Sequence, residues 1–372
     1  MNKVIPLVRP FNSPEIERSV LEVLRSGRIA SGPVVEDFER KMATYLGVKH
    51  VVAANSGTAA LHLAFLACGI GSGAEVVTTP FSFFASTSTI LQTGAKPIFA
   101  DINPSTYNIS PEHVRKSLSE RSRAIEPVHL YGQPCEMDEL LETAREHDLY
   151  VIEDAAQAIG AEYKGRKAGT LGDVGCFSTY VSKNLHTGEG GFLATDNEEI
   201  AEKARVLGSH GQIGKYNHVM FGFNYRMNEI EAAIGREQIP LLDGFNETRR
   251  KNASHLRDQL KGVQGIVTPT EIPDVKHVYH QFTVRVTKPG GRETRDRIIA
   301  TLRGEGIEAD VHYPTIIPLQ PACKGKVEYT EGQCSQAELA SQTVISLPIS
   351  PIVSSSDIDR EATTLARAVM LT

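Results

Sequence analysis

The sequence predicts an α/β protein with a mainly parallel, seven-stranded sheet in a large domain and a smaller C-terminal α/β domain. Between about residues 48 and 196, short runs rich in Val and Ile alternate with stretches that carry apolar residues at three-to-four spacing. A strand followed by a helix and another strand usually forms a crossover unit, so this alternation favours parallel pairing. The length of 372 residues is enough for two domains, and a hydrophobic content of 41% can fill their cores.

Each expected element follows from its local pattern. The seven strands are the apolar runs Val48–Ala53, Glu75–Thr79, Lys96–Ala100, Ala124–Leu130, Tyr150–Ile152, Val174–Ser178 and Phe192–Thr195. The helices are the amphipathic stretches Pro14–Ser26, Val34–Leu46, Ala59–Cys68, Phe83–Gln92, Met137–His147, Glu229–Leu242, Glu247–Gly262 and Glu293–Gly304. Two further strand-like segments, His280–Val286 and Gly306–Tyr313, are expected in the C-terminal third. Pro240 and Gly244 punctuate two helices, which gives domains of residues 1–240 and 241–372.

The composition argues against several classes of partner. The net charge of −6 is spread along the chain and no five like charges follow one another, so neither a nucleic-acid arm nor a polybasic membrane patch is predicted. The five cysteines form no CxxC pair and their number is odd, so neither a metal site nor a disulfide framework is expected. Residues 1–14 lack the apolar stretch of a signal peptide, and no segment reaches the roughly 18 apolar residues that span a bilayer. We therefore expect a cytoplasmic protein.

A phosphate cradle is one interpretation of the segment Val51–Leu61. An apolar strand runs into Ser56, Gly57 and Thr58, and a strong helix former follows at once. Ser56 is a good N-cap, and Gly57 allows a ligand to approach the backbone closely. Exposed amides at a helix start bind phosphate readily. A well-capped helix without any ligand explains the same residues.

Two further residues carry candidate chemistry. Asp154 follows the strand Tyr150–Ile152 at the carboxyl edge of the expected sheet, where open α/β folds bind ligands. It could pair with a cationic ring nitrogen or cap the next helix. Lys183 lies between a strand and a glycine-rich loop, among small residues that leave room for a planar cofactor. A lysine that forms a Schiff base needs a lowered pKa, which burial or a nearby cation provides.

These pieces, in this order, resemble the DegT/DnrJ/EryC1/StrS family of sugar aminotransferases. The likeness continues through residues 26–33, 128–134, 222–228 and 312–314. The resemblance implies the aspartate-aminotransferase-like fold type I of pyridoxal-phosphate (PLP) enzymes, which alternate between PLP and pyridoxamine phosphate. It also implies a homodimer with active sites at the interface, a nucleotide-linked keto-sugar substrate, and usually L-glutamate as donor, in amino-sugar or polysaccharide biosynthesis.

The resemblance also assigns residues. Lys183 matches the Schiff-base lysine, Asp154 the acid on the ring nitrogen, and Gln157 the neighbour of the ring hydroxyl. The other cofactor-binding candidates are Ser56, Gly57, Thr58 and Ser178 at the phosphate, Phe83 stacked on the ring, and Asn224 donated by the partner subunit. Phe81 and Phe84 compete with Phe83 for the stacking role, and Phe83 could also be an ordinary core aromatic. Candidates for substrate contact are Arg28, His186, Arg226, His312 and Tyr313.

Two departures and several alternatives bear on the substrate. His186 stands where relatives often have a small residue, and Gln320 where many have histidine. The run Thr187–Gly191 looks like members that act at a C4 keto group, and C3 is the alternative. A sugar 3-dehydratase would carry histidine in place of Lys183, and a non-catalytic regulator would tolerate loss of Lys183 or Asp154. A dinucleotide-dependent oxidoreductase would need its glycine fingerprint after a strand, whereas Gly69–Gly73 follows a helix.

Overall fold

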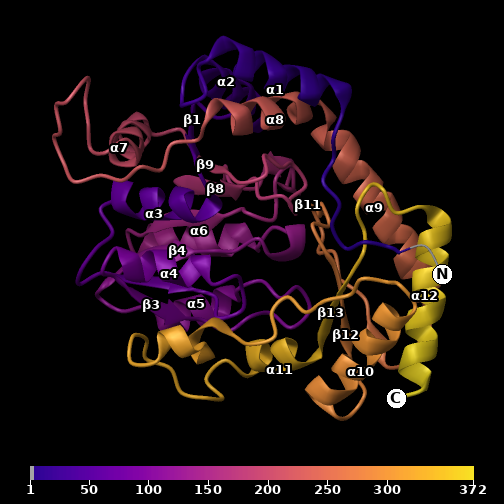
Figure 1. Ribbon diagram of the computed structural model, residues 1–372. Helices are drawn as coiled ribbons and strands as arrows, with labels where there is room; N and C mark the ends of the chain where they lie inside the picture. The colour runs from indigo at the N-terminus through magenta and orange to yellow at the C-terminus, as the bar shows by residue number, and fades with distance from the viewer. Residues whose placement is uncertain (1–3) are drawn as a thin grey trace.

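A seven-stranded sheet forms the centre of the computed structural model, which describes residues 4–372 (Figure 1). The strand order is β1 (His50–Ala54), β9 (Gly191–Thr195), β8 (Val174–Ser178), β5 (Tyr150–Asp154), β4 (Ser122–Glu126), β2 (Glu75–Thr78) and β3 (Lys96–Phe99). Only β9 is antiparallel to its neighbours, β1 and β8, and the other adjacent pairs are parallel. The sheet is therefore mixed and mostly parallel, which confirms the predicted fold class.

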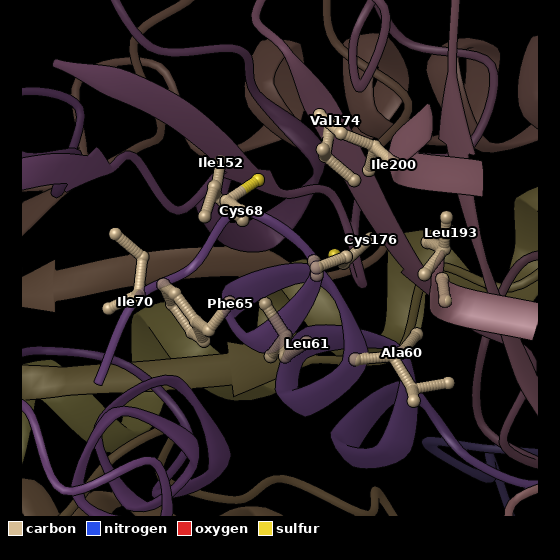
Figure 2. Close-up of a cluster of buried hydrophobic side chains, with 14 of the residues drawn as sticks. Ala60, Leu61, Phe65, Cys68, Ile70, Ile152, Val174, Cys176, Leu193 and Ile200 are labelled. Atoms are coloured by element: carbon tan, nitrogen blue, oxygen red, sulfur yellow. The ribbon is translucent and has the colours of Figure 1, made fainter. Parts of the chain in front are cut away.

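Helices cover both faces of this sheet. On one face, α3 (Gly57–Ala67), α4 (Ala85–Gln92) and α7 (Glu198–Gly208) pack on alternate residues of the central strands. Figure 2 shows part of this layer, in which Leu61 and Phe65 of α3 belong to one buried cluster with Cys176 and Leu193 of the sheet. On the other face lie α2 (Pro33–Leu46), α5 (Pro111–Ser117), α6 (Met137–Glu146) and α8 (Glu229–Gln238). Successive residues of β5 thus face opposite layers, as the two-residue period of a strand requires.

The C-terminal part has its own core. The three-stranded sheet β10 (Ile266–Val267), β12 (Phe282–Val286) and β13 (Val344–Leu347) packs with α9 (Leu242–Gln259), α10 (Gly291–Gly304) and α12 (Ser355–Met370). Ile5, from the other end of the chain, is buried in the same cluster. The helical turn at 239–241 joins α8 directly to α9. The domain boundary near residue 240 stays a prediction.

The remaining elements complete the chain. They are α1 (Pro14–Ser26), α11 (Ser335–Thr343), and the small sheet β11 (Val275–Lys276), β6 (Glu162–Tyr163) and β7 (Arg166–Lys167), with single 3-10 turns at 130–132, 317–319 and 321–323. Helix α1 has the predicted bounds because Ser13 caps its start and Gly27, in the left-handed conformation, ends it. None of the helices between residues 4 and 372 combines the length and apolar character of a membrane span.

The expected strand Gly306–Tyr313 was wrong. Ile307 forms a single bridge with Ile5, and Asp310 forms a single bridge with Ser346. Because the segment pairs with two different partners in turn, no continuous ladder forms. It leads instead into Tyr313, beside the cavity described next.

Candidate active site

A cavity of about 460 Å³ lies at the carboxyl edge of the central strands. Its walls come from the start of α3, the segment before α4, the ends of β5 and β8, and the distant segments around His280 and Tyr313. Of the residues singled out from the sequence, those that line it are Ser56, Gly57, Thr58, Phe83, Asp154, Gln157, Ser178, Lys183, His312 and Tyr313. The fold therefore brings together residues that lie up to 257 positions apart in the chain.

The start of α3 is shaped for an anion. Ser56 is the N-cap, and its Oγ accepts a hydrogen bond of 3.0 Å from the amide of Ala59. A Cβ on Gly57 would lie 2.8 Å from Cβ of Ser178, so only glycine lets α3 approach β8 this closely. The helix start and the hydroxyls of Thr58 and Ser178 face one cavity, which suits a phosphate group.

Lys183 is half-buried, lies in a tight turn after β8 and lines the cavity. Its backbone amide donates to the carbonyl of Tyr180 at 2.8 Å, which fixes the turn. Burial lowers the pKa of Lys183 to about 8, although the charge of Asp154 acts in the opposite direction. A substantial fraction of the amine is therefore neutral near physiological pH, as a nucleophile or a base requires.

Asp154 is a buried carboxylate whose charge is only partly compensated. Its Oδ2 accepts from Oγ of Ser86 at 2.8 Å, and its Oδ1 accepts from the amide of Ala156 at 3.1 Å. Burial raises the pKa of Asp154, while these two hydrogen bonds and the nearby Lys183 lower it. A protonated ring nitrogen placed in the cavity would supply the missing positive charge.

Gln157 connects the sheet edge to the C-terminal part. Its Oε1 accepts from the amide of Tyr131 at 2.8 Å, and its Nε2 donates to the hydroxyl of Tyr313 at 3.0 Å. The hydroxyl of Tyr131 in turn donates to the carbonyl of His312. This network holds the 312–313 segment over the cavity and leaves the Gln157 side chain fixed on its wall.

Phe83 is the aromatic residue of its segment that reaches the cavity. Its side chain is 58% exposed, whereas Phe81 is fully buried. Phe84 packs against the cluster that contains Phe81. The ring of Phe83 lies 6.2 Å from that of Tyr313, measured between centroids. An exposed ring at the cavity wall is available to stack on a planar ligand.

Four candidates lie outside the cavity within one chain. His186 is buried, and its Nε2 lies 2.9 Å from the carbonyl of Phe11. Nη1 of Arg226 donates to Oγ of Ser209 at 3.1 Å, and Arg28 is exposed. The carbonyl of Asn224 accepts from Nδ2 of Asn55 at 3.3 Å.

The segment that carries Asn224 and Arg226 is unusual. It leaves the body of the molecule as the long loop between α7 and α8 (Figure 1). Large apolar side chains are exposed along it, namely Ile213, Tyr216, Val219, Met220 and Phe221.

Several residues at the site escaped prediction. Ser86 holds Asp154, and Ser82 in turn lies 3.0 Å from Ser86, between the two Oγ atoms. The four-residue spacing of these serines, facing the sheet from the start of α4, could have indicated a pair. His280 and Gln281 also line the cavity. They come from a segment about 100 residues beyond Lys183, and no local pattern marks them.

The cavity residues fit pyridoxal phosphate. The anion cradle, the amine and the partly compensated carboxylate line one cavity, as the phosphate, aldehyde and ring nitrogen of that cofactor require. A fold of this topology with such a site defines an aminotransferase-like enzyme.

Comparison with known proteins agrees with this class. The model of the DegT/DnrJ/EryC1/StrS aminotransferase family matches residues 11–366. The chain is 43% identical to the pleiotropic regulatory protein of Geobacillus stearothermophilus, over 91% of this chain and 90% of that protein. It is 40% identical to the dTDP-3-amino-3,4,6-trideoxy-alpha-D-glucose transaminase of Streptomyces venezuelae, over 91% and 87%. The chain belongs to the DegT/DnrJ/EryC1/StrS aminotransferase family.

Solved structures show the same fold. The crystal structure of S. venezuelae DesV superposes with a TM-score of 0.91 at 38% identity, and covers 95% of this chain and 94% of that one. The PLP form of Spr1654 from Streptococcus pneumoniae gives a TM-score of 0.94 at 26% identity over 99% of both chains. Its PMP form gives the same score. Solved relatives thus carry PLP or its aminated form, which implies PLP for the family.

Proposed function

We propose that this protein is a PLP-dependent aminotransferase that moves an amino group from an amino acid, L-glutamate, to a nucleotide-linked keto-sugar in the cytoplasm. The observation that carries the proposal is Lys183, with a pKa lowered to about 8, in one cavity with Asp154 and the Ser56–Thr58 turn. Family membership supports the reaction class.

Each residue then has a role toward the cofactor and the donor. PLP, when bound, supplies the electron sink. The start of α3, with Ser56, Gly57 and Thr58, and Ser178 on β8 hold the phosphate. Asp154 would hold a proton on the ring nitrogen. Gln157 would face the ring hydroxyl, and Phe83 would stack on the ring.

Lys183 moves the proton in this scheme. With PLP and the amino acid in the cavity, the amine of Lys183 would take the proton from the α-carbon of the amino acid and hold it for return. A pKa of about 8 suits this task, since a general base works best with a pKa near the operating pH.

We also propose a homodimer with shared active sites. The loop between α7 and α8 extends from the body and exposes five large apolar side chains, which is unusual for a surface that faces water. Asn224 and Arg226, at its end, would then reach the partner subunit's cavity, with Asn224 at the phosphate. Arg28 and His186 stay candidates for substrate contact. Sedimentation of the Phe221→Asp variant as a monomer would support this assembly.

The central test removes the amine. The purified protein should absorb visible light through the cofactor linked to Lys183, and Lys183→Ala should lose both that linkage and turnover. In cofactor-free protein, the rate of PLP capture should rise with pH, reach half its maximum near pH 8 and level off above that, because only the neutral amine reacts. A midpoint near the ordinary lysine value of 10.5, or full turnover by Lys183→Ala, would refute the proposal.

The carbon that receives nitrogen needs its own experiment. The run Thr187–Gly191 favours C4, because it resembles family members that act there. The S. venezuelae relative has a 3-amino sugar in its name, so C3 is the second candidate. The enzyme should be incubated with glutamate and a panel of UDP-, dTDP- and GDP-linked 4-keto and 3-keto sugars. Product mass identifies the nucleotide, and NMR assignment of the aminated carbon decides between C4 and C3.

A regulatory role is the alternative from another class. It is favoured by the name of the Geobacillus relative. A regulator has no need of an amine with a lowered pKa in one cavity with a buried acid. Protein that stays colourless with PLP, and shows no spectral change with glutamate, would favour the regulator.

A further inference from the structure

A second cavity, of about 60 Å³, lies behind Lys183. Its walls come from the N-terminal segment 7–11, the turn that holds Lys183, helix α9 and the loop after β13. Four residues line both this cavity and the main one, namely Ser182, Lys183, His280 and Gln281. The two cavities therefore meet at the reactive amine.

The second cavity is positively charged. Lys183, Arg249 and Arg9 line it, and no Asp or Glu does. His280, on the shared wall, is affected by this positive charge. Burial lowers the pKa of His280 well below its ordinary value, and the charges of Lys183, Arg249 and His312 lower it further. An anion would be attracted to this place.

Arg249 is a buried cation in this cavity whose hydrogen-bond partners are backbone carbonyls and not carboxylates. It is 8% exposed, and Nη1 donates only to the carbonyls of Tyr279 and His280, at 3.2 and 3.3 Å. Within residues 4–372 it has no carboxylate at ion-pair distance, and its Nε has no hydrogen-bond partner. Burial lowers the pKa of Arg249 to about 10. A buried guanidinium is normally paired, so a partner from outside the chain is implied.

Other polar atoms on the same walls also lack partners. Oγ of Ser350 and Nδ1 of His280 are buried without a hydrogen bond. A hydroxyl, a guanidinium and an imidazole N–H are the donors that bind carboxylates in proteins. Native structures leave few buried polar groups unpaired, so a group of them around one cavity points to a ligand.

We propose that the second cavity is a carboxylate-binding subsite, with Arg249 and Ser350 as donors, and that it takes one carboxylate of the amino donor. The inference rests on the proposed function and deepens it. A donor whose amine arrives at Lys183 lies next to this cavity, and one carboxylate is small enough to enter. The diphosphate of a nucleotide-sugar is too large for it.

The two half-reactions separate this role from a structural one. Arg249→Gln should raise the KM for glutamate about tenfold or more, since a charge-assisted hydrogen bond is lost. The reaction of the aminated enzyme with the keto-sugar should keep its rate within about twofold, because that substrate does not use the subsite. Arg250→Gln is the matched control, since Arg250 is the next residue of α9 and is already paired with Glu271 at 2.7 Å.

Direct binding is measured with glutarate, an unreactive dicarboxylate, on the holoenzyme. Glutarate should raise the melting temperature of the wild type and of Arg250→Gln, and should do so much less for Arg249→Gln. Ser350→Ala removes a hydroxyl that has no partner and should weaken glutarate binding severalfold. This variant tests the subsite if Arg249→Gln does not fold.

Equal glutarate protection of Arg249→Gln, Ser350→Ala and wild type would overturn the proposal, as would equal losses in both half-reactions. Loss of the linkage to Lys183 would instead refute the proposed function. If the wild type were colourless and inactive but still bound glutarate, the anion subsite would be supported and the proposed function would be refuted.

Discussion

Glu153 and Asp154 are consecutive acids at the end of β5, and they differ in how many hydrogen-bond donors surround their carboxylates. Both are buried, with 0% and 5% of their surfaces exposed. Glu153 points to the face covered by α6 and α8, and accepts hydrogen bonds from Nε2 of His129 and from the amides of Gly169, Leu171 and Gly172. Asp154 points to the opposite face and has two donors from the chain.

The pKa values follow this difference. Burial alone would raise the pKa of both carboxyls. For Glu153, the hydrogen bond and charge of His129, with the backbone amides, outweigh burial, and the net pKa is lowered. For Asp154 burial wins, and the pKa is raised. A buried acid that its own chain satisfies holds the fold together, whereas one left short of positive charge marks a place for a ligand.

Asp154→Asn should give the largest effect of the substitutions considered, and it should lower activity without lowering stability. Asparagine keeps the size and the bond from Ser86 but cannot hold the ring nitrogen protonated. We expect kcat/KM to fall about 100-fold or more, the loss that follows removal of one preorganised electrostatic group. The free energy of unfolding of the cofactor-free protein, from urea titration, should stay equal or rise, because a penalised buried charge is gone.

Unchanged turnover by Asp154→Asn would break the comparison, since the acid would then have no partner in the reaction. A large loss of stability would break it too, because Asp154 would then resemble Glu153.

Glu153→Gln should show the reverse. The amide group of glutamine would place an N–H against donors that now bind a carboxylate, so the free energy of unfolding should fall by about 3 kcal/mol. Turnover per folded molecule should stay within a few-fold, measured after correction for the folded fraction. Because the pKa of Glu153 is lowered on folding, its contribution is present at neutral pH and is lost as pH falls below its ordinary value of 4.5.

The gap between the unfolding free energies of wild type and Glu153→Gln should therefore narrow in acid. A gap that stays constant from pH 7 down to about pH 3, well below the ordinary value, would show that the carboxylate charge is not what stabilises the fold.

Local patterns predicted the frame of this site well. The bounds of helix α1 were predicted correctly because its capping residues are its immediate neighbours in the sequence. Six of the seven predicted strands match an observed strand to within two residues at either end. The seventh, Ala124–Leu130, ends four residues too late. Pro127 has no amide to donate, and beyond it the segment keeps only a single bridge to β5, between Val128 and Asp154. The Lys183 and Asp154 positions followed from motif and resemblance together.

Other features depend on contacts that no local pattern encodes. The reversed direction of β9 is one, since an apolar run reads the same in either orientation. Strand β13 and helix α12 went unassigned, although Ser354 and Asp357 form a capping box that could have marked the start of α12. Ser86 and His280 join the site only through packing across the sheet and between distant segments.

Ser86→Ala offers the finest test of the two acids, and the smallest effect. The substitution removes the 2.8 Å bond to Oδ2 of Asp154 and leaves the amide of Ala156 as the remaining donor from the chain. The pKa of Asp154 should then rise further, because the Ser86 bond is what lowers it most. Since a raised pKa means that the carboxylate is lost at a higher pH, the acid limb of the kcat/KM profile should move upward.

At neutral pH the loss from Ser86→Ala should be about tenfold or less, as expected for one hydrogen bond to a charged group. Ser88→Ala is the matched control, because Ser88 lies on the same helix and bonds only to the carbonyl of Ala85. If both variants gave the same pH profile of kcat/KM, the hydrogen bond from Ser86 would not affect the pKa of Asp154. A shift of the acid limb in Ser86→Ala alone would show that the bond from Ser86 sets the pKa of Asp154. It would also support the view that Asp154, unlike Glu153, has too few donors from its own chain.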